Sequence, residues 1–540
     1  MAASTLLISL AIFSLAPRAS SISIGNVDTS TTVGFVQEDN TRDTISLLLS
    51  CFATLGLCVY SAVHLNIPRK SEGFYRTLLR ELFWCIIGLF APELILYTAW
   101  RQLASARQLR YEVEQARNKS DKSTEHDKRT SSWTIAHGFY GTMGGFAIDI
   151  DHTETRYAPL FGNAERLTLT AKGVALLAQC GHIPDISLDD IKDKNKADGL
   201  AKLLVCIQAG WMIIQVITRT ATGLPTTLLE VHTVAHVVCA LIMYVLWWHK
   251  PRQVASPTIL KGDWVWPFAA YMFLASRMSG EVPKGKLAMF RHATPQMKQL
   301  VYLDDDGTAA LPHENIAHLT TSALGAKGHF RPRGEHFGNN PEPSSPMPED
   351  EISAEHKRIA AEAVALYPAL RARFVAIDQE CSASRYHPYA TELVQDHALD
   401  WPNAGFLRRT QSLVMGMVLW GASMTYGAIH VAAWDYFFPT QLEKLFWHLS
   451  SVWVTFCAAF WLLTNLLAKV FPGIDRVWVA YNERRLGWVS VSLITSLCVL
   501  CGVSYVVSRA FLVVEAFVSI REVPEDVYKT TAWSQVFPHL

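Results

Sequence analysis

One stretch constrains the fold of this chain more than any other: two apolar segments joined by a tight turn, Ala201–Thr220 and Thr227–Pro251. Each is about 20 residues long, which is the length an α-helix needs to cross the hydrocarbon core of a bilayer. The second segment ends in aromatic and basic residues typical of the membrane–water interface, Trp247, Trp248, His249 and Lys250. The stretch therefore predicts a transmembrane helical hairpin.

A polar stripe runs along one face of the first helix of this hairpin. Gln208, Gln215 and Arg219 fall on the same face at 100° per residue. Polar side chains are costly against lipid, so the stripe is expected to face the interior of a helix bundle. It could form a polar pathway or ligand surface, or it could supply hydrogen bonds that fix helix packing.

Glu230 comes three residues after Thr227 at the predicted start of the second helix. This spacing fits a capping box, in which each side chain accepts a hydrogen bond from the other residue's backbone amide. An ion pair from Glu230 to Arg219 across the short turn is a compatible hypothesis. The carboxylate is thus interpreted first as a helix cap.

Two histidines, His232 and His236, lie four residues apart on one face of the same helix. That spacing can serve a metal site, although Glu230 points about 200° away and cannot complete it from the same helix. The alternative is that both rings make hydrogen bonds between helices. No metal and no other cofactor is predicted, and the two histidines are kept only as weak metal candidates.

The composition supports a membrane protein. Of 540 residues, 50% are hydrophobic and only 18% are charged, below the quarter or so found in soluble domains. Net charge is zero, which gives no support for nucleic-acid binding, and membrane lipid is the only partner indicated. The predicted fold class is an all-α polytopic membrane protein with about seven transmembrane helices and two polar insertions. The expected spans are Thr44–Leu65, Leu82–Trp100, Ala201–Thr220, Thr227–Pro251, Gln411–Val431, Leu445–Leu467 and Gly487–Val507.

These spans divide the chain into six parts. Residues 1–20 resemble a signal peptide, because a short apolar run precedes small residues. The others are 21–101 (exposed N-terminal segment and two helices), 102–200 (polar insertion), 201–251 (hairpin), 252–410 (second insertion) and 411–540 (three helices and a tail). Within the second insertion, Gly325–Glu351 is rich in Gly, Pro, Ser and charge, which predicts disorder.

Ionisable residues also occur inside or beside other spans. Pro92 is expected to kink the second span, and Glu93 beside it would lie at membrane depth. An acid at that depth is either a functional group or a protonated carboxyl that closes the polar defect left by the proline. Arg509 and Glu515, near the end of the last helix, and His430, near the end of the fifth, are interpreted as interfacial.

In the first insertion, Met143 to Phe146 reads MGGF. Two adjacent glycines predict a close approach of backbone or an unusual dihedral angle, because glycine alone lacks a Cβ.

Two signals for membrane orientation disagree. A cleaved signal peptide places the N-terminal segment in the lumen or outside the cell, on the secretory pathway or at the plasma membrane. With seven spans, however, most flanking Lys and Arg residues then lie on the non-cytoplasmic side, against the positive-inside rule. The signal-peptide orientation is adopted as the expectation.

Several motifs together make the chain resemble a large group of fungal multi-pass integral membrane proteins of unknown function. The matching segments are HLNIP (64–68), APE (91–93), HGFYGTMGGF (137–146), DKNKAD (193–198), GLPTTLLE (223–230), WWHKP (247–251) and RAFLVVEAFVSIREVP (509–524). The resemblance implies a polytopic membrane protein with an N-terminal signal. It implies no reaction, and Asn195 stands where the group usually has Ser.

Three functions are compatible with these features. The first is a transporter, channel or receptor-like protein whose substrate-binding residues are Glu93, Gln208, Gln215 and Arg219. The second is a structural or interaction protein that docks partners on its two insertions. The third is a membrane-embedded enzyme, for which no catalytic signature of the G-x-S-x-G or P-loop type is found.

Overall fold

The computed structural model describes most of the chain. The described residues are 32–37, 42–120, 133–150, 157–194, 199–274, 276, 278, 358–359, 366–367, 393–400, 412–482 and 486–530. The expected signal peptide, the Gly325–Glu351 segment and the end of the DKNKAD motif lie outside these residues.

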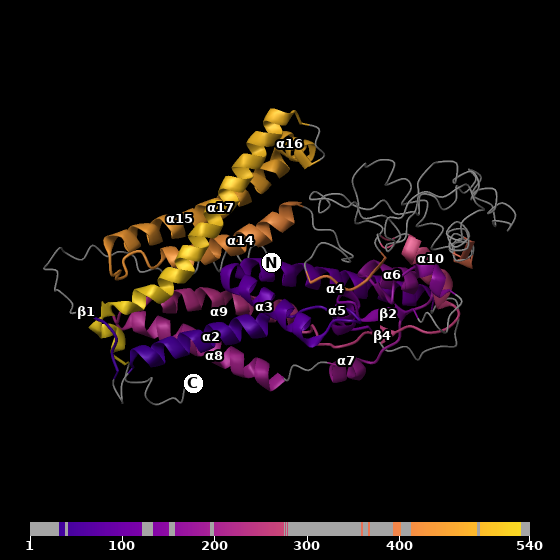
Figure 1. Ribbon diagram of the computed structural model, residues 1–540, viewed down its shortest axis with the longest axis horizontal. Coiled ribbons are helices and arrows are strands. Elements are labelled where there is room, and N and C mark those ends of the chain that lie inside the picture. The colour runs from indigo at the N-terminus through magenta and orange to yellow at the C-terminus, as the bar shows by residue number, and fades with distance from the viewer. Residues whose placement is uncertain are drawn as a thin grey trace, which may run out of the picture.

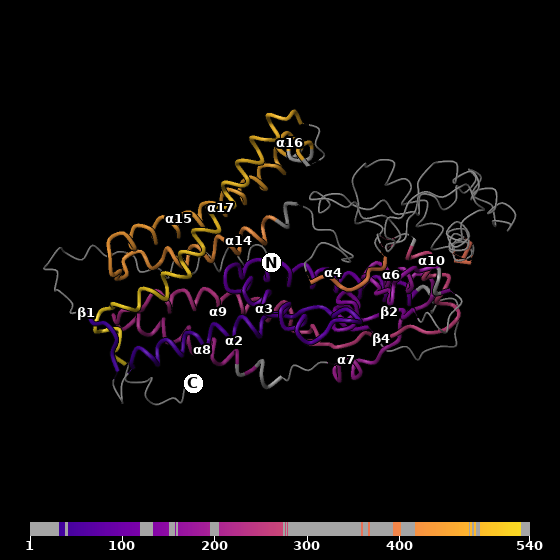
Figure 2. Tube along the Cα trace, viewed as in Figure 1, coloured from indigo at the N-terminus to yellow at the C-terminus, as the bar shows by residue number. Residues whose placement is uncertain are grey.

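The described chain is mostly helical, and its long helices form an elongated bundle (Figures 1 and 2). These helices are α2 (Thr44–Ala62), α3 (Phe74–Phe90), α4 (Pro92–Ser120), α8 (Gly199–Ala221), α9 (Leu228–Trp247), α14 (Ser412–Val431), α15 (Gln441–Val470), α16 (Pro472–Asn482) and α17 (Trp488–Val518). The central helix is α9, since it contacts α2, α4, α8, α14 and α17 and is buried along most of its length.

By length and composition, four helices of the described chain could cross a membrane: α2, α9, α15 and the helix that begins at Trp488. The pair α3 and α4 would make a fifth if it counted as one span. Apolar side chains on α15 and α17 are largely exposed, for example Phe456 and Leu500. Exposed apolar surface of this extent marks contact with lipid or with another protein.

The segment predicted as a single kinked span, Leu82–Trp100, is two helices. Helix α3 ends at Phe90 and α4 begins at Pro92, and the two axes differ by 112°. The prediction of one continuous kinked helix was therefore wrong, although Pro92 was correctly predicted to interrupt it. Proline has no amide proton and clashes with the preceding turn, so it stops one helix and suits the first position of the next.

The two polar insertions fold together into one lobe. It contains α5 (Ile135–Thr142), α6 (Ala171–Gln179), α7 (Leu188–Lys194) and α10 (Val265–Leu274). Its four-stranded sheet has the order β4-β2-β3-β5, from Thr258–Ile259, Phe146–Asp149, Arg166–Leu169 and Val394–Gln395. Only β2 and β4 run parallel among these strands. The all-α prediction missed this sheet because its strands are short and come from segments far apart in the chain, between residues 146 and 395.

The MGGF motif behaves as predicted. Gly144 has φ +86°, in the left-handed region that favours glycine. A Cβ on Gly145 would lie 2.3 Å from the Tyr140 ring and 2.4 Å from its carbonyl oxygen. The motif lets the chain turn sharply from α5 into β2 against Tyr140.

The two ends of the described chain meet at one end of the bundle. Strand β1 (Thr32–Val33) pairs antiparallel with β6 (Val523–Pro524), as the indigo and yellow ribbons near β1 show (Figure 1). The hydroxyls of Thr44 and Tyr528 are 2.8 Å apart. The segments before α2 and after α17 therefore share one end of the bundle, here called the termini end, and the lobe lies at the other end.

Candidate interior polar site

A buried ion pair joins the start of α4 to α17. Arg509 Nη2 donates to Glu93 Oε2, and the Tyr505 hydroxyl donates to Glu93 Oε1 at 2.9 Å. Glu93 and Arg509 are 3% exposed. The expectation that Arg509 lies at the interface was wrong, because it faces inward to neutralise Glu93. Glu93 therefore has both an ion-pair partner and a hydrogen-bond partner, as a buried acid requires.

Rings from two further helices pack against this ion pair. The Arg509 guanidinium carbon lies 3.6 Å from the centroid of the Tyr426 ring of α14, a cation–π contact. His232 Nδ1 of α9 is 3.1 Å from His430 Nε2 of α14 and 3.3 Å from the Tyr426 hydroxyl. All three rings are buried. His430 was expected at the interface, but it packs inward because α14 contacts α9 directly.

We call this group of side chains the interior polar cluster. Its members are Glu93 (α4), His232 and His236 (α9), Ser423, Tyr426 and His430 (α14), and Tyr505 and Arg509 (α17). Three polar atoms in it have no hydrogen-bond partner within the described chain: Nε and Nη1 of Arg509 and Nε2 of His232. Buried polar atoms without partners are rare in native proteins, so these three atoms require water or another bound group.

The cluster is not arranged as a metal site. The described chain holds no group of three or more His, Cys, Asp or Glu side chains placed to bind an ion. The ring nitrogens of His236 face backbone oxygens instead, Nδ1 at 3.0 Å from His232 O and Nε2 at 2.8 Å from Leu89 O. His236 therefore connects α9 to the end of α3.

The other predicted site residues do not lie with Glu93. Gln208 donates to the Thr54 hydroxyl of α2 at 3.1 Å, a hydrogen bond between helices. Gln215 is half-buried about two turns further along α8. Arg219 lies at the termini end and donates to four carbonyl oxygens, those of Pro225, Asp526, Val527 and Lys529.

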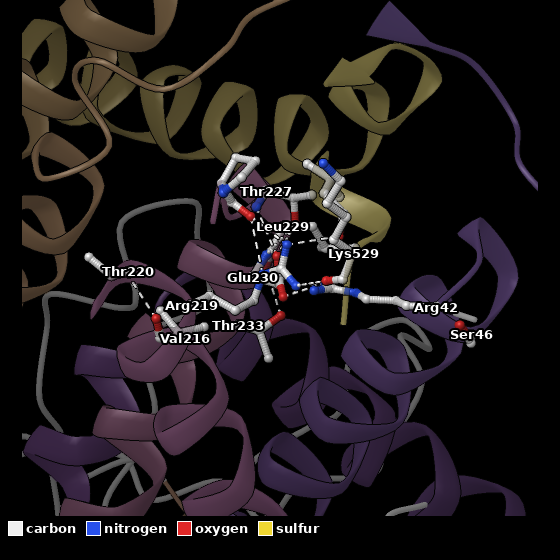
Figure 3. A network of polar contacts seen from close by, with 12 residues as sticks. Arg42, Ser46, Val216, Arg219, Thr220, Thr227, Leu229, Glu230, Thr233 and Lys529 are labelled. Carbon is white, nitrogen blue, oxygen red and sulfur yellow. Dashed lines mark hydrogen bonds and ion pairs between the residues drawn. The ribbon is translucent and has the colours of Figure 1, made fainter. Parts of the chain in front are cut away.

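Figure 3 shows how Arg219 and Glu230 are placed. The predicted capping box is confirmed: Thr227 N donates to Glu230 Oε2 at 2.8 Å, and Glu230 N donates to Thr227 Oγ1 at 3.2 Å. The predicted pair between Glu230 and Arg219 is not formed. Glu230 Oε1 pairs at 2.5 Å with Arg42, which precedes α2, and the guanidinium of Arg219 is used by the backbone of the C-terminal segment.

Lys250 also differs from its expected role as an interfacial anchor. Its Nζ is buried and donates to His64 O, to Asn66 Oδ1 at 3.0 Å and to Gln102 Oε1 at 2.7 Å. Burial lowers the pKa of Lys250 to about 7, and the nearby Asp400 carboxylate opposes this shift. The HLNIP and WWHKP motifs thus meet in one polar joint between the bundle and the lobe.

Sequence reasoning identifies three members of the cluster and misjudges the rest. Glu93, His232 and His236 stand out as ionisable groups inside apolar runs. Tyr426 and Tyr505 carry no signal, since tyrosines are common in apolar helices. An arginine well inside α17 is a usable signal, because a charge in an apolar helix generally has a buried partner.

The fold and site define a class: a mostly helical protein with several helices able to span a membrane and an ionisable cluster between them. The model of a family of unknown function (DUF8562) matches residues 9–412 and 390–540. The chain belongs to this family. None of the curated proteins and no solved structure matches it.

Proposed function

We propose that the protein is an integral membrane protein with six crossings and one re-entrant hairpin. The crossings are α2, α8, α9, α14, α15 and α17, and the hairpin is formed by α3 and α4. This replaces the seven spans expected from sequence. It is supported by the pairing of β1 with β6, because segments on the same side of a membrane must be separated by an even number of crossings.

The helix ends support the same count. The α8–α9 turn lies at the termini end, because Arg219 donates to the carbonyl oxygen of Lys529. The start of α15 lies there too, because Glu443 pairs with Arg521 at 2.5 Å. The opposite end holds the lobe, into which α4 runs through its contacts with α5 and α6. The α3–α4 pair leaves the lobe end, turns at Ala91 beside the interior polar cluster and returns.

Six crossings also remove the conflict over orientation. The short connections at the termini end, 222–227 and 432–440, contain no Lys or Arg. Those at the lobe end, 63–73 and 471–487, contain Arg69, Lys70, Arg476, Arg484 and Arg485. The positive-inside rule then places the lobe in the cytosol and both termini on the opposite side, as a signal peptide requires.

The native sequon at Asn118 tests this orientation, because it belongs to the lobe end and should not be glycosylated. A second sequon, appended after Leu540, should be glycosylated. In a membrane preparation, glycosidase should therefore shift the mass of the appended variant and leave the native chain unchanged. The opposite pattern would reverse the orientation, and modification of both would contradict the six-crossing arrangement.

Within this topology we propose that the protein is a transporter or receptor-like protein that takes a small polar ligand at the interior polar cluster. The observation that carries the proposal is the break at Ala91–Pro92 against the Glu93–Arg509 pair. Broken helices at membrane depth are tolerated where they are buried in protein or line a wet path, and intramembrane ion pairs with histidines mark ligand and proton pathways.

Thiol labelling tests this function. In a background without native cysteines, His232→Cys should react with a water-soluble, membrane-impermeant thiol reagent. Leu500→Cys is the matched control, since Leu500 is 68% exposed on α17 and would face lipid. If His232→Cys is as unreactive as the control, the cluster is closed to water and the proposed function fails.

A second function is favoured by the lobe. Both insertions contribute strands to its sheet, and it has its own apolar core around Phe146, Leu167 and Phe268. A folded lobe facing the cytosol could dock protein partners. This interaction role predicts that binding of partners survives Glu93→Gln, and co-purification of partners with both forms of the chain would measure it.

A further inference from the structure

A cavity of about 290 Å³ lies at the termini end, between three segments that are far apart in the sequence. They are the α8–α9 turn (220–228), the α14–α15 connection (435–437) and the C-terminal segment (519–527). Figure 3 labels two of the lining residues, Thr220 and Thr227. The volume is at the lower end of the range for small-molecule sites, about 300–1,000 Å³. We call this space the termini-end cavity.

The lining of this cavity is apolar, with several hydroxyl groups and a single charge. Leu224, Phe437 and Val523 supply apolar surface, and Tyr436 adds an aromatic ring with a hydroxyl. Asp435 is the one charged residue among the described residues that line the cavity. Ligand sites commonly combine apolar walls with a few polar groups that fix the orientation of the ligand. The lining therefore suits a compact apolar body with one polar end.

The ends of two helices favour a positive charge in the cavity. Thr220 lies in the last turn of α8, and Ser519 directly follows α17. The carboxyl end of a helix carries partial negative charge on its unpaired carbonyl groups, so it attracts cations. One helix also begins at the cavity, α9 at Leu228, but its positive end is already matched by the Glu230 carboxylate of the capping box.

The side chains near the cavity have the same bias. Asp435 is exposed and has no hydrogen-bond or ion-pair partner within the described chain. Glu515, one helical turn before Ser519, is 4% exposed, and its Oε1 also has no hydrogen-bond partner there. Basic groups of the same end already have partners: Arg42 with Glu230, Arg521 with Glu443, Lys529 with Asp526, and Arg219 with backbone carbonyl oxygens.

We propose that the termini-end cavity binds a small organic cation, in which an ammonium group is attached to a compact apolar body. Asp435 accepts hydrogen bonds from the ammonium group, and Tyr436 and Phe437 pack against the body. Calcium and magnesium ions suit this lining less well, because they take about six or more oxygen ligands. The inference goes beyond the proposed function, because the cavity shares no lining residue with the interior polar cluster.

Equilibrium dialysis of the purified full chain in detergent tests the inference, with empty micelles as the background. Benzylammonium, benzyl alcohol and benzoate serve as probes, since they share an aromatic ring and differ in charge. Benzylammonium should bind about 10-fold more tightly than benzyl alcohol, because a hydrogen bond to a charged group contributes about that factor. Benzoate should bind more weakly than the alcohol, because its charge meets that of Asp435.

Variants assign the binding to this cavity. Asp435→Asn should weaken benzylammonium binding about 10-fold and leave benzyl alcohol binding unchanged, since only the charge is removed. Thr226→Trp should weaken the binding of both probes, because Thr226 lines the cavity and the larger side chain would fill it. Glu525→Gln is the matched control and should behave as wild type, since Glu525 is an exposed acid of the same C-terminal segment that does not line the cavity.

Three outcomes would overturn the inference. Similar binding of all three probes would show that the ring only partitions into apolar surface. Benzylammonium binding that survives Asp435→Asn undiminished would place the cation elsewhere, and this exposed substitution still decides the question if Thr226→Trp fails to fold. No binding of benzylammonium to the wild type at millimolar concentration would remove the cavity as a cation site. The labelling of His232→Cys tests the proposed function separately from all three.

Discussion

Substituting Gly138 by alanine tests the contact that joins the bundle to the lobe. Gly138 lies in α5 directly against α4, and a Cβ there would be 2.3 Å from the carbonyl oxygen of Ala106. Ordinary contacts between such atoms are 3.4 Å or more, so the two helices would have to move apart by about 1 Å. Backbone atoms cannot rotate out of the way as side chains can. The added methyl group therefore cannot be accommodated without loss of packing.

The expected size of the effect comes from two opposing contributions. Alanine in a helix is favoured over glycine by about 0.5–1 kcal/mol, and overpacking a dense contact costs about 1–3 kcal/mol. The net destabilisation should be about 1–2 kcal/mol. Local opening of α5 would then be about 10-fold more frequent, because about 1.4 kcal/mol corresponds to a factor of ten.

Hydrogen exchange detected by mass spectrometry measures this directly. The peptide covering 135–142 should lose about 10-fold in protection in Gly138→Ala. Gly210→Ala is the control, since Gly210 lies in α8 with no atom within 4 Å of an added Cβ. It should leave that peptide unchanged and stabilise α8 slightly. Unchanged or increased protection in Gly138→Ala would show that α4 and α5 do not pack as closely as described.

Three other contacts give testable outcomes. Burial raises the pKa of Asp400, so the native state holds a proton more tightly than the unfolded state. The contribution of Asp400 to stability should therefore be fully present below its ordinary pKa of 3.8 and be lost as pH rises from there through the raised native pKa, by at most about 1.4 kcal/mol per pH unit. Asp400→Asn should abolish this slope in urea titrations at several pH values. Arg42→Gln should lower the free energy of unfolding by about 3 kcal/mol in the same titrations, because it leaves the Glu230 carboxylate buried without its partner. A loss under about 0.5 kcal/mol would contradict the ion pair. A double-mutant cycle of Gln208→Leu with Thr54→Val should give a coupling of about 0.6 kcal/mol, and a coupling of zero would show that this hydrogen bond contributes nothing.

The sequence by itself determined the helices and their local ends. Runs of about 20 apolar residues predicted α2, α8, α9, α14, α15 and α17 closely, because helix hydrogen bonds and caps are local. The sequence also predicted the capping box of Glu230 and the glycine turn of MGGF, because each depends on residues only a few positions apart.

Only the tertiary structure decided how these elements combine. Three buried charges have partners far away in the chain. Glu93 pairs with Arg509, Glu230 pairs with Arg42, and Lys250 donates to the 64–66 segment. The hydrophobic periodicity of a sequence predicts local helices and strands, and it contains no information about pairings between distant segments. The even number of proposed crossings likewise depends on the pairing of β1 with β6. Each strand has only two residues, and the two lie at opposite ends of the described sequence. A short strand has almost no signal of its own, because its stability comes from the partner it meets in three dimensions.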